Sequence, residues 1–223
     1  MILREVVDTL IRSVSGGVNT IDNKYEPRYV EALVPQLREQ AIKLDYFGGR
    51  NNAASRRLDY AYTQQVTVSV DTGLNNNLDH VTFTIPKPLS LGRMVNGLVY
   101  VGQENNAVSF AQMYNREDIA NAKARGMFNG SVIAFFWEGG KLEVYGNKML
   151  TEVNIRGVFS DPTVVSGFSI EVDDYPVNEA LLLIMTDLFK ANQNINVQKP
   201  ADPILDNADT NTRAVTANNI RQS

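Results

Sequence analysis

Few residues of this chain have the type and spacing that catalysis requires. His80 is the one histidine, so a histidine-based acid–base site or a Ser-His-Asp triad would have to use it. A histidine between a turn and a strand, with no positioned partner in view, is more often a strand-edge residue. Carboxylate pairs for sugar hydrolysis could be drawn from Glu138, Glu143, Glu152 and Asp161, but nothing distinguishes them from surface carboxylates. We therefore predict no catalytic residues.

Three segments resemble ligand-binding loops only in part. Residues 126–131 lack the lysine of a phosphate loop, and 139–141 fall in a predicted hairpin turn, not at the start of a helix. The loop 71–79 has oxygen-bearing side chains at alternating positions, yet a calcium loop needs more carboxylates and a closing bidentate glutamate. One histidine and no cysteine exclude a multi-histidine or cysteine-based zinc site. No cofactor and no metal are expected.

The one basic cluster is Arg50, Arg56 and Arg57. Three arginines could contact phosphates. The formal net charge of −4 favours the other interpretation, which is a solvated loop or ion pairs between subunits. Both interpretations stay open at this point.

Composition places the chain among globular proteins and excludes several classes of protein. The 223 residues, 43% of them hydrophobic, suffice for one large core. The absence of cysteine excludes a disulfide scaffold and a thiol nucleophile. The apolar start carries Arg4, Glu5, Asp8 and Arg12, unlike a signal peptide, and no run reaches the ~18 apolar residues of a membrane span. We expect a protein that is neither exported through a signal peptide nor embedded in a membrane.

Helical periodicity marks both ends of the chain. Apolar residues at three–four spacing predict a first helix over 2–14, ended by glycines, and a second over about 27–47. Pro35 inside the second segment predicts a kink or two abutting helices. Its apolar positions are Val30, Leu33, Val34, Leu37, Ala41, Ile42 and Leu44. Acidic residues at 173–174 and Pro176 predict the start of a last helix.

Between these helices the period changes to two. Alternation predicts strands at 65–70, 81–85, 98–101, 131–137, 141–145, 152–159 and 166–172, with a short helix at 115–123. Glu138-Gly139-Gly140 is a strong hairpin signal. The fold class is therefore α+β: a small bundle of two N-terminal helices and one C-terminal helix, with a large antiparallel β insertion and an extended C-terminal tail. The predicted parts are 1–59 (helical), 60–172 (β insertion), 173–192 (helix packing on the first two) and 193–223 (extended arm).

Four stretches stand out in this layout: MILREVVDTLIRSVSGG, EPRYVEALVPQLREQAI, TEVNIRGVFSDP and NEALLLIMTDLFKANQNINVQKPADPILDN. Together with the layout, they resemble the tail adaptor or ring proteins of short-tailed bacteriophages, especially the crAss-like phages of gut bacteria. The resemblance implies a non-enzymatic virion protein, made in the host cytoplasm. It implies a twelve-fold ring beneath the portal that extends the DNA channel and docks further tail proteins. Mild acidity suits a channel through which DNA slides without sequence-specific binding.

The C-terminal segment is expected to act as an inter-subunit arm. Pro200 and Pro203 favour an extended path, and the apolar side chains of Ile204, Leu205, Val215 and Ile220 are spaced along a polar stretch. About 25 extended residues reach ~80 Å, so these side chains could dock on another subunit.

Two other functional classes remain as alternatives. One is a different phage structural or carbohydrate-binding module, such as a baseplate or fibre attachment domain, with a sugar platform drawn from Tyr100, Tyr114, Trp137 and Tyr145. Their alternation with Val and Phe favours core positions for most of them. The other is an enzyme that uses His80 or a carboxylate pair. No small-molecule substrate is expected.

Overall fold

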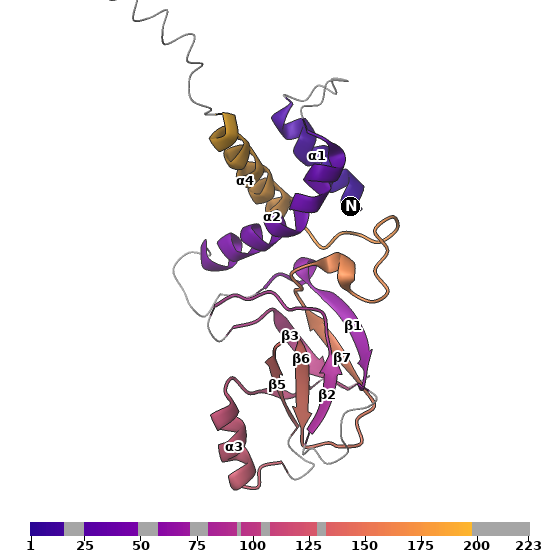
Figure 1. Cartoon of the computed structure of the whole chain (residues 1–223), viewed down its shortest axis with the longest axis vertical. Coiled ribbons are helices and arrows are strands. Elements are labelled where there is room, and N and C mark those ends of the chain that lie inside the picture. The colour runs from indigo at the N-terminus through magenta and orange to yellow at the C-terminus, as the bar shows by residue number, and fades with distance from the viewer. Residues whose placement is uncertain are drawn as a thin grey trace, which may run out of the picture.

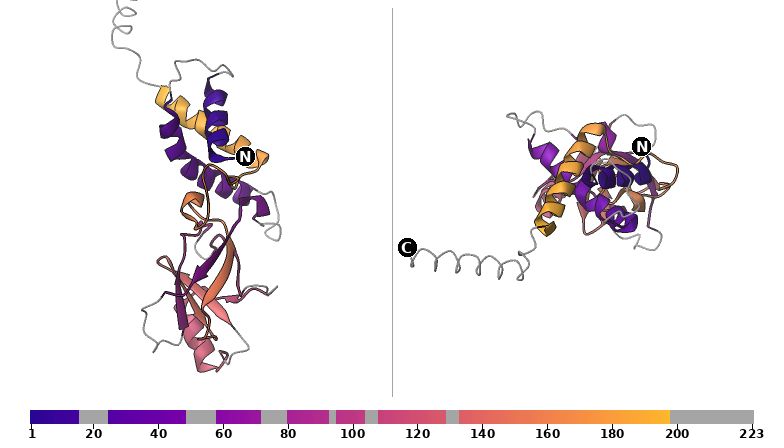
Figure 2. Two further views of the ribbon diagram at one scale, coloured as in Figure 1. Left: turned by 90° about the vertical axis from the view of Figure 1, so that its right-hand side faces the viewer. Right: turned by 90° about the horizontal axis from the view of Figure 1, so that it is seen from above.

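The molecule is elongated, with a bundle of helices at one end and two β-sheets and the short helix 116–124 at the other (Figure 1). The computed structural model describes residues 1–15, 25–48, 58–71, 80–92, 95–103, 108–128 and 133–197, the side chains of 193–197 excepted. The left view of Figure 2 shows the same two-part arrangement after a quarter turn about the long axis. The predicted α+β class is confirmed.

Three helices form the bundle: α1 (Leu3–Val14), α2 (Pro27–Gly48) and α4 (Glu179–Val197). Each contacts the other two, because each carries one apolar stripe that must be covered. Glu5 accepts a hydrogen bond from the Ile2 N–H (3.0 Å) at the start of α1. The buried residues that the three helices contribute are Leu3, Val6, Val7, Leu10, Ile11, Val30, Val34, Leu37, Ala41, Ile42, Leu181, Met185 and Phe189.

α2 differs from its prediction at two points. It runs through Pro35 as one helix, so the alternative of two abutting helices is wrong. Leu44 was placed on the apolar face but is 53% exposed. The last turn of α2 thus leaves Leu44 and Phe47 at the surface of the described structure.

The β insertion folds into two sheets. The first has the order β1-β7-β3, from β1 (Gln64–Ser69), β7 (Glu152–Gly157) and β3 (Leu98–Gly102), all antiparallel. The second has the order β2-β6-β5-β4, from β2 (His80–Thr84), β6 (Lys141–Tyr145), β5 (Ala134–Glu138) and β4 (Ala111–Gln112). β4 pairs with β5 in parallel. The prediction of an antiparallel β insertion is therefore wrong for this one strand pair.

The β5–β6 hairpin is confirmed where the sequence predicts it. Glu138 lies opposite Lys141, and the two residues between them are Gly139 (φ 61°) and Gly140 (φ 86°). Two successive positive φ angles are what a two-residue hairpin of type I′ requires, and glycine adopts them without strain.

Three apolar clusters hold the parts together. The bundle core includes Leu89, Leu91 and Val158 from the insertion. A second cluster lies between the inner faces of the sheets and includes Phe83, Phe135, Leu142, Val144, Val153 and Ile155. α3 (Arg116–Ala124) covers the outer face of the second sheet through Ile119, Phe136 and Tyr145. Both faces of β5 are therefore buried, which explains its continuous apolar run.

Two boundaries before α4 differ from the predictions. Residues 166–172 form turns and not a strand, with Gly167 at φ 86°. The last helix begins at Glu179, not near 173, because the Tyr175 N–H bonds the Met1 carbonyl (2.9 Å) and Asn178 caps the helix by accepting from the Leu181 N–H (2.8 Å). It then continues to Val197, five residues into the segment predicted as an arm.

Candidate functional site

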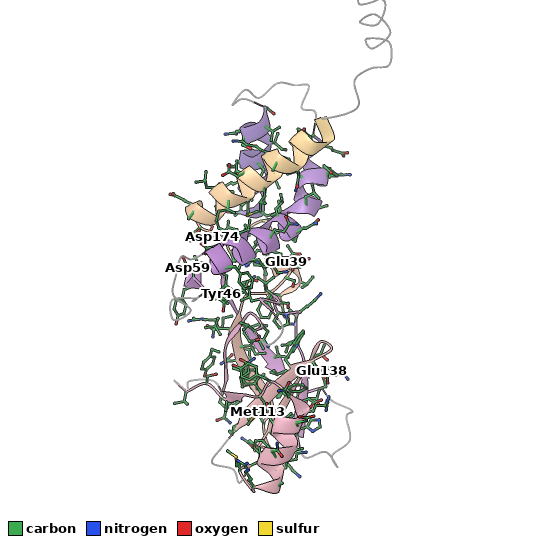
Figure 3. All side chains as sticks on the ribbon, turned by 90° about the vertical axis from the view of Figure 1, so that its left-hand side faces the viewer. Glu39, Tyr46, Asp59, Met113, Glu138 and Asp174 are labelled. Atoms are coloured by element: carbon green, nitrogen blue, oxygen red, sulfur yellow. The ribbon has the colours of Figure 1, made fainter. Side chains whose placement is uncertain are left out.

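The predicted arm and basic loop both lie outside the described residues. This applies to Pro200, Pro203, Ile204, Leu205, Val215 and Ile220 of the arm and to Arg50, Arg56 and Arg57 of the loop. The roles given to them stay predictions. The described structure instead contains two charged side-chain groups: one beside α3 and one around Arg38, where the bundle meets the β insertion. Figure 3 marks these regions by Glu138 beside α3 and Asp174 among the helices.

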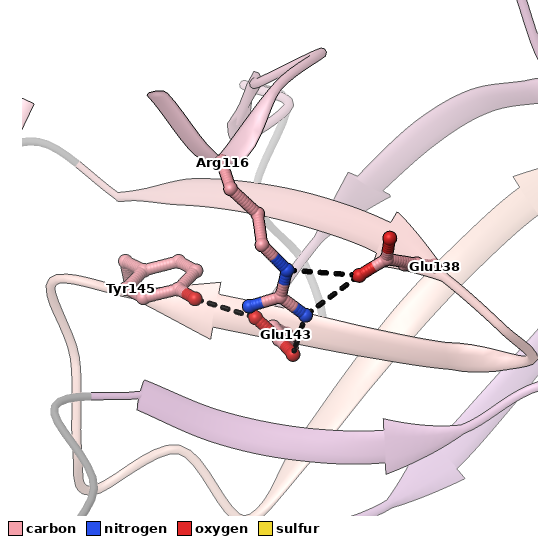
Figure 4. Close-up of polar contacts among 4 residues, drawn as sticks. All are labelled: Arg116, Glu138, Glu143 and Tyr145. Carbon is pink, nitrogen blue, oxygen red and sulfur yellow. Dashed lines mark hydrogen bonds and ion pairs between the residues drawn. The ribbon is translucent and has the colours of Figure 1, made fainter. Parts of the chain in front are cut away.

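Arg116, the first residue of α3, brings two of the four candidate carboxylates together (Figure 4). Its Nε and Nη2 donate to Glu138 Oε2 at 2.9 and 2.7 Å, and Nη2 also donates to Glu143 Oε1 at 3.1 Å. The Tyr145 hydroxyl donates to the other oxygen of Glu143. Because Glu138 ends β5 and Glu143 lies within β6, the guanidinium fastens α3 to the hairpin.

His80 also lies at this cluster, opposite Tyr145 in the β2–β6 register. The two ring centroids are 4.9 Å apart. Burial opposes the ionisation of Glu143, but the hydrogen bond from Tyr145 and the charges of His80 and Arg116 together hold its pKa below the ordinary value. Glu143 is therefore a stable carboxylate at neutral pH.

The charges around Glu143 suit the attachment of α3 to the hairpin better than they suit sugar hydrolysis. A glycosidase needs one carboxyl group with a raised pKa to act as general acid. Here both carboxylates share one guanidinium, and the pKa shift of Glu143 has the opposite sign. The arrangement can hold α3 in place, and Glu143 does not have the raised pKa that a general acid needs.

The other two candidate carboxylates lie elsewhere. Glu152 opens β7 opposite Ser69 and is exposed. Asp161 accepts from the N–H (2.9 Å) and the hydroxyl (2.7 Å) of Thr163 and so begins the short helix η3 (Pro162–Val164). Neither is part of a carboxylate pair with Glu138 or Glu143.

The most deeply buried charge of the described residues belongs to Arg38 of α2, which was not among the residues singled out from the sequence. It is 0% exposed and donates to three backbone carbonyls: Nη2 to Tyr62 (2.8 Å), Nη1 to Phe159 (2.9 Å) and Nε to Pro176 (3.0 Å). Tyr62 precedes β1 and Phe159 follows β7, so one side chain ties both ends of the β insertion to the bundle. Burial lowers the pKa of Arg38 to about 10, and the group stays charged at neutral pH.

A signal for Arg38 was present in the sequence. The residue lies four positions after Val34 and four before Ile42, in the middle of the apolar stripe of α2. A charge at such a position needs buried acceptors. The acceptors themselves could not be identified, because they are backbone oxygens far away in the sequence.

The four aromatic residues of the predicted sugar platform do not share one surface. Tyr145 is 2% exposed and stacks on Phe128 under α3. Trp137 packs against the core between the sheets. Tyr114 lies near the edge of β5 and is exposed, whereas Tyr100 lies on the outer face of the other sheet. The platform as predicted is therefore not formed.

The loop predictions are covered only in part. The two carboxylate oxygens of Asp71 accept hydrogen bonds from the N–H (3.1 Å) and the hydroxyl (2.8 Å) of Thr84. Residues 72–79 lie outside the described structure. Within the described ranges, no group of three or more metal-ligating side chains gathers. In the same ranges, no helix is both long and apolar enough to cross a membrane.

No protein-family model matches this chain, and no curated protein matches it.

Proposed function

We propose that this chain is a structural, non-enzymatic subunit of a bacteriophage tail. In this proposal, copies of it form a closed ring beneath the portal, extend the DNA channel and dock further tail proteins. The proposal follows from the resemblance to tail adaptor proteins, which share the layout of a helical bundle with a β insertion and a C-terminal arm.

The observation that carries the proposal is the junction at Arg38. One buried guanidinium holds the start of the insertion, its end and the segment before α4. Burying a charge with three fixed acceptors supports a rigid connection between the helical end and the β end. A rigid connection suits a subunit that, in this proposal, docks different partners at its two ends.

The surface offers a further argument. A ring needs two different contact surfaces on each subunit. Exposed apolar side chains occur on the last turn of α2 (Leu44 and Phe47) and, on a separate segment, at Val164, Ile170 and Val172. Two separate apolar surfaces are compatible with the heterologous contact of a closed ring.

The test is the assembly state of the full-length chain. Mass photometry at micromolar concentration, alone and with the neighbouring portal and tail proteins, should show a discrete oligomer of about twelve subunits. Negative-stain images should show rings with a central opening. A tight monomer that persists in the presence of those neighbours would contradict the proposal.

A further inference from the structure

The outer face of the sheet β1-β7-β3 carries two ordered rows of polar side chains. Gln65 and Tyr100 lie opposite Arg156 from the two sides, and Thr67 and Gly102 lie opposite Asn154 in the next row. Residues directly opposite each other in an antiparallel pair point to the same face. The rows are therefore one continuous surface, turned away from the core between the two sheets.

A shallow pocket of about 330 Å³ lies on this surface, close to the lower end of the range for small-ligand sites. Its polar and aromatic lining consists of Tyr60, Gln65, Tyr100, Gln103, Asn154 and Arg156. Gly102 allows the Tyr100 ring to lie along the pocket, because the ring occupies the space that a Cβ at position 102 would take. The Tyr100 hydroxyl reaches on to the Gln103 carbonyl (3.2 Å).

Among the described residues that line this pocket, Arg156 is the one that carries a charge. Its guanidinium lies 5.4 Å from the centre of the Tyr60 ring and donates to Gln65 Oε1 at 3.4 Å. No carboxylate of the described residues forms an ion pair with it. A guanidinium positioned on an aromatic ring retains donors for a carboxylate.

The remaining lining groups suit hydroxyl groups and the face of a ring. Asn154 is 8% exposed, and its Oδ1 accepts from the Thr67 hydroxyl, which leaves its NH₂ group as a donor. Gln65 and Gln103 add carboxamides, which both donate and accept, as sugar hydroxyls do. Tyr60 is 69% exposed, and its ring is accessible to the apolar face of a pyranose.

We propose that this pocket, the Arg156 pocket, binds a sugar residue that carries a carboxylate. Arg156 pairs with the carboxylate, the carboxamides bond the hydroxyls, and a tyrosine ring packs against the sugar ring. A single cation matches one carboxylate better than a phosphate dianion, for which several cations or backbone N–H groups are usual. The inference goes beyond the proposed ring and does not depend on it, since all its residues belong to one chain.

The test is ligand titration of the full-length chain, followed by ¹H–¹⁵N NMR. The probes are trisaccharides of galacturonate and of glucuronate and a sialylated trisaccharide, each beside its neutral counterpart, with inorganic phosphate as a further probe. At least one acidic sugar should bind about tenfold or more tightly than its neutral counterpart and shift the amides of Gln65, Asn154 and Arg156. Binding by none of the acidic sugars, equal binding of the neutral ones, or binding of phosphate alone would overturn the proposal.

The matched variants are Arg156→Gln and Arg125→Gln. The first removes the charge from the pocket and keeps a side chain that can bond Gln65; the second removes an exposed charge after α3. Arg156→Gln should weaken acidic-sugar binding about tenfold or more and leave neutral sugars unchanged, whereas Arg125→Gln should change neither. Unchanged acidic-sugar binding in a folded Arg156→Gln protein, judged from its NMR spectrum, would also overturn the proposal. Both readouts are taken at a concentration at which the chain is monomeric, so failure of the proposed ring and failure of the Arg156 pocket are distinguishable.

Discussion

At the scale of single residues, Arg38 has the largest structural role. Replacing it with methionine keeps most of its packing volume but leaves the carbonyls of Tyr62, Phe159 and Pro176 buried without their donor. Each unsatisfied buried carbonyl costs about 1–3 kcal/mol. We expect Arg38→Met to lower the free energy of unfolding by about 3 kcal/mol or more, measured by urea denaturation.

The matched control is Arg28→Met, on the exposed first turn of the same helix. It removes the same charge and adds the same side chain, so its effect should stay within about 0.5 kcal/mol. Equal stability of the two variants would show that the three carbonyls find other donors, and the junction would then not depend on Arg38.

At the scale of elements, the attachment of α3 depends on pH. The folded pKa of Glu143 lies below its ordinary value of 4.5. The ionised group therefore contributes stability that is present above about pH 4.5 and is lost as pH falls through the folded pKa. We expect Glu143→Gln to remove about 1 kcal/mol at pH 7, less at more acidic pH, because the wild-type carboxylate is then protonated too.

The measurement is urea denaturation of both proteins between pH 7 and pH 3. Glu117→Gln is the control, since Glu117 is exposed on α3 and forms none of the ion pairs of the described structure. If the stability difference between wild type and Glu143→Gln stays constant as the pH falls, the ionised form of Glu143 does not stabilise the folded protein, and the prediction is wrong.

Elements were predictable from the sequence wherever local chemistry determines them. The apolar stripe of α1, the alternation of β1 and the Gly139-Gly140 turn each fix a local conformation and were placed correctly. The strand at 166–172 and the start of the last helix were placed wrongly, because contacts distant in sequence decide them: the Met1 carbonyl holds Tyr175, and Arg38 holds Pro176. The Arg116 cluster and the Arg38 junction likewise combine residues visible in the sequence with partners that are distant in sequence. Glu138 and Glu143 were candidates, but Arg116, which joins them, comes from a separate element.

At the scale of the whole molecule, the prediction concerns the residues after α4. The chain continues for 26 residues beyond Val197, and that stretch contains all of the predicted arm except its first five residues. If its apolar side chains dock on a neighbouring subunit, deletion of residues 200–223 should leave the described fold intact and impair assembly. The reason is that every contact of the bundle and the sheets described above is made by residues before 198.

The measurement compares the truncated and full-length chains by circular dichroism, urea denaturation and mass photometry. We expect similar spectra, a free energy of unfolding within about 0.5 kcal/mol at a concentration at which both are monomeric, and loss of the oligomer only in the truncated chain. A control replaces Ile204, Leu205, Val215 and Ile220 with serine at full length, which keeps the arm's length and removes its apolar contacts. Assembly of this control with wild-type affinity would contradict docking through those side chains, because the arm would then act through its backbone or its polar groups.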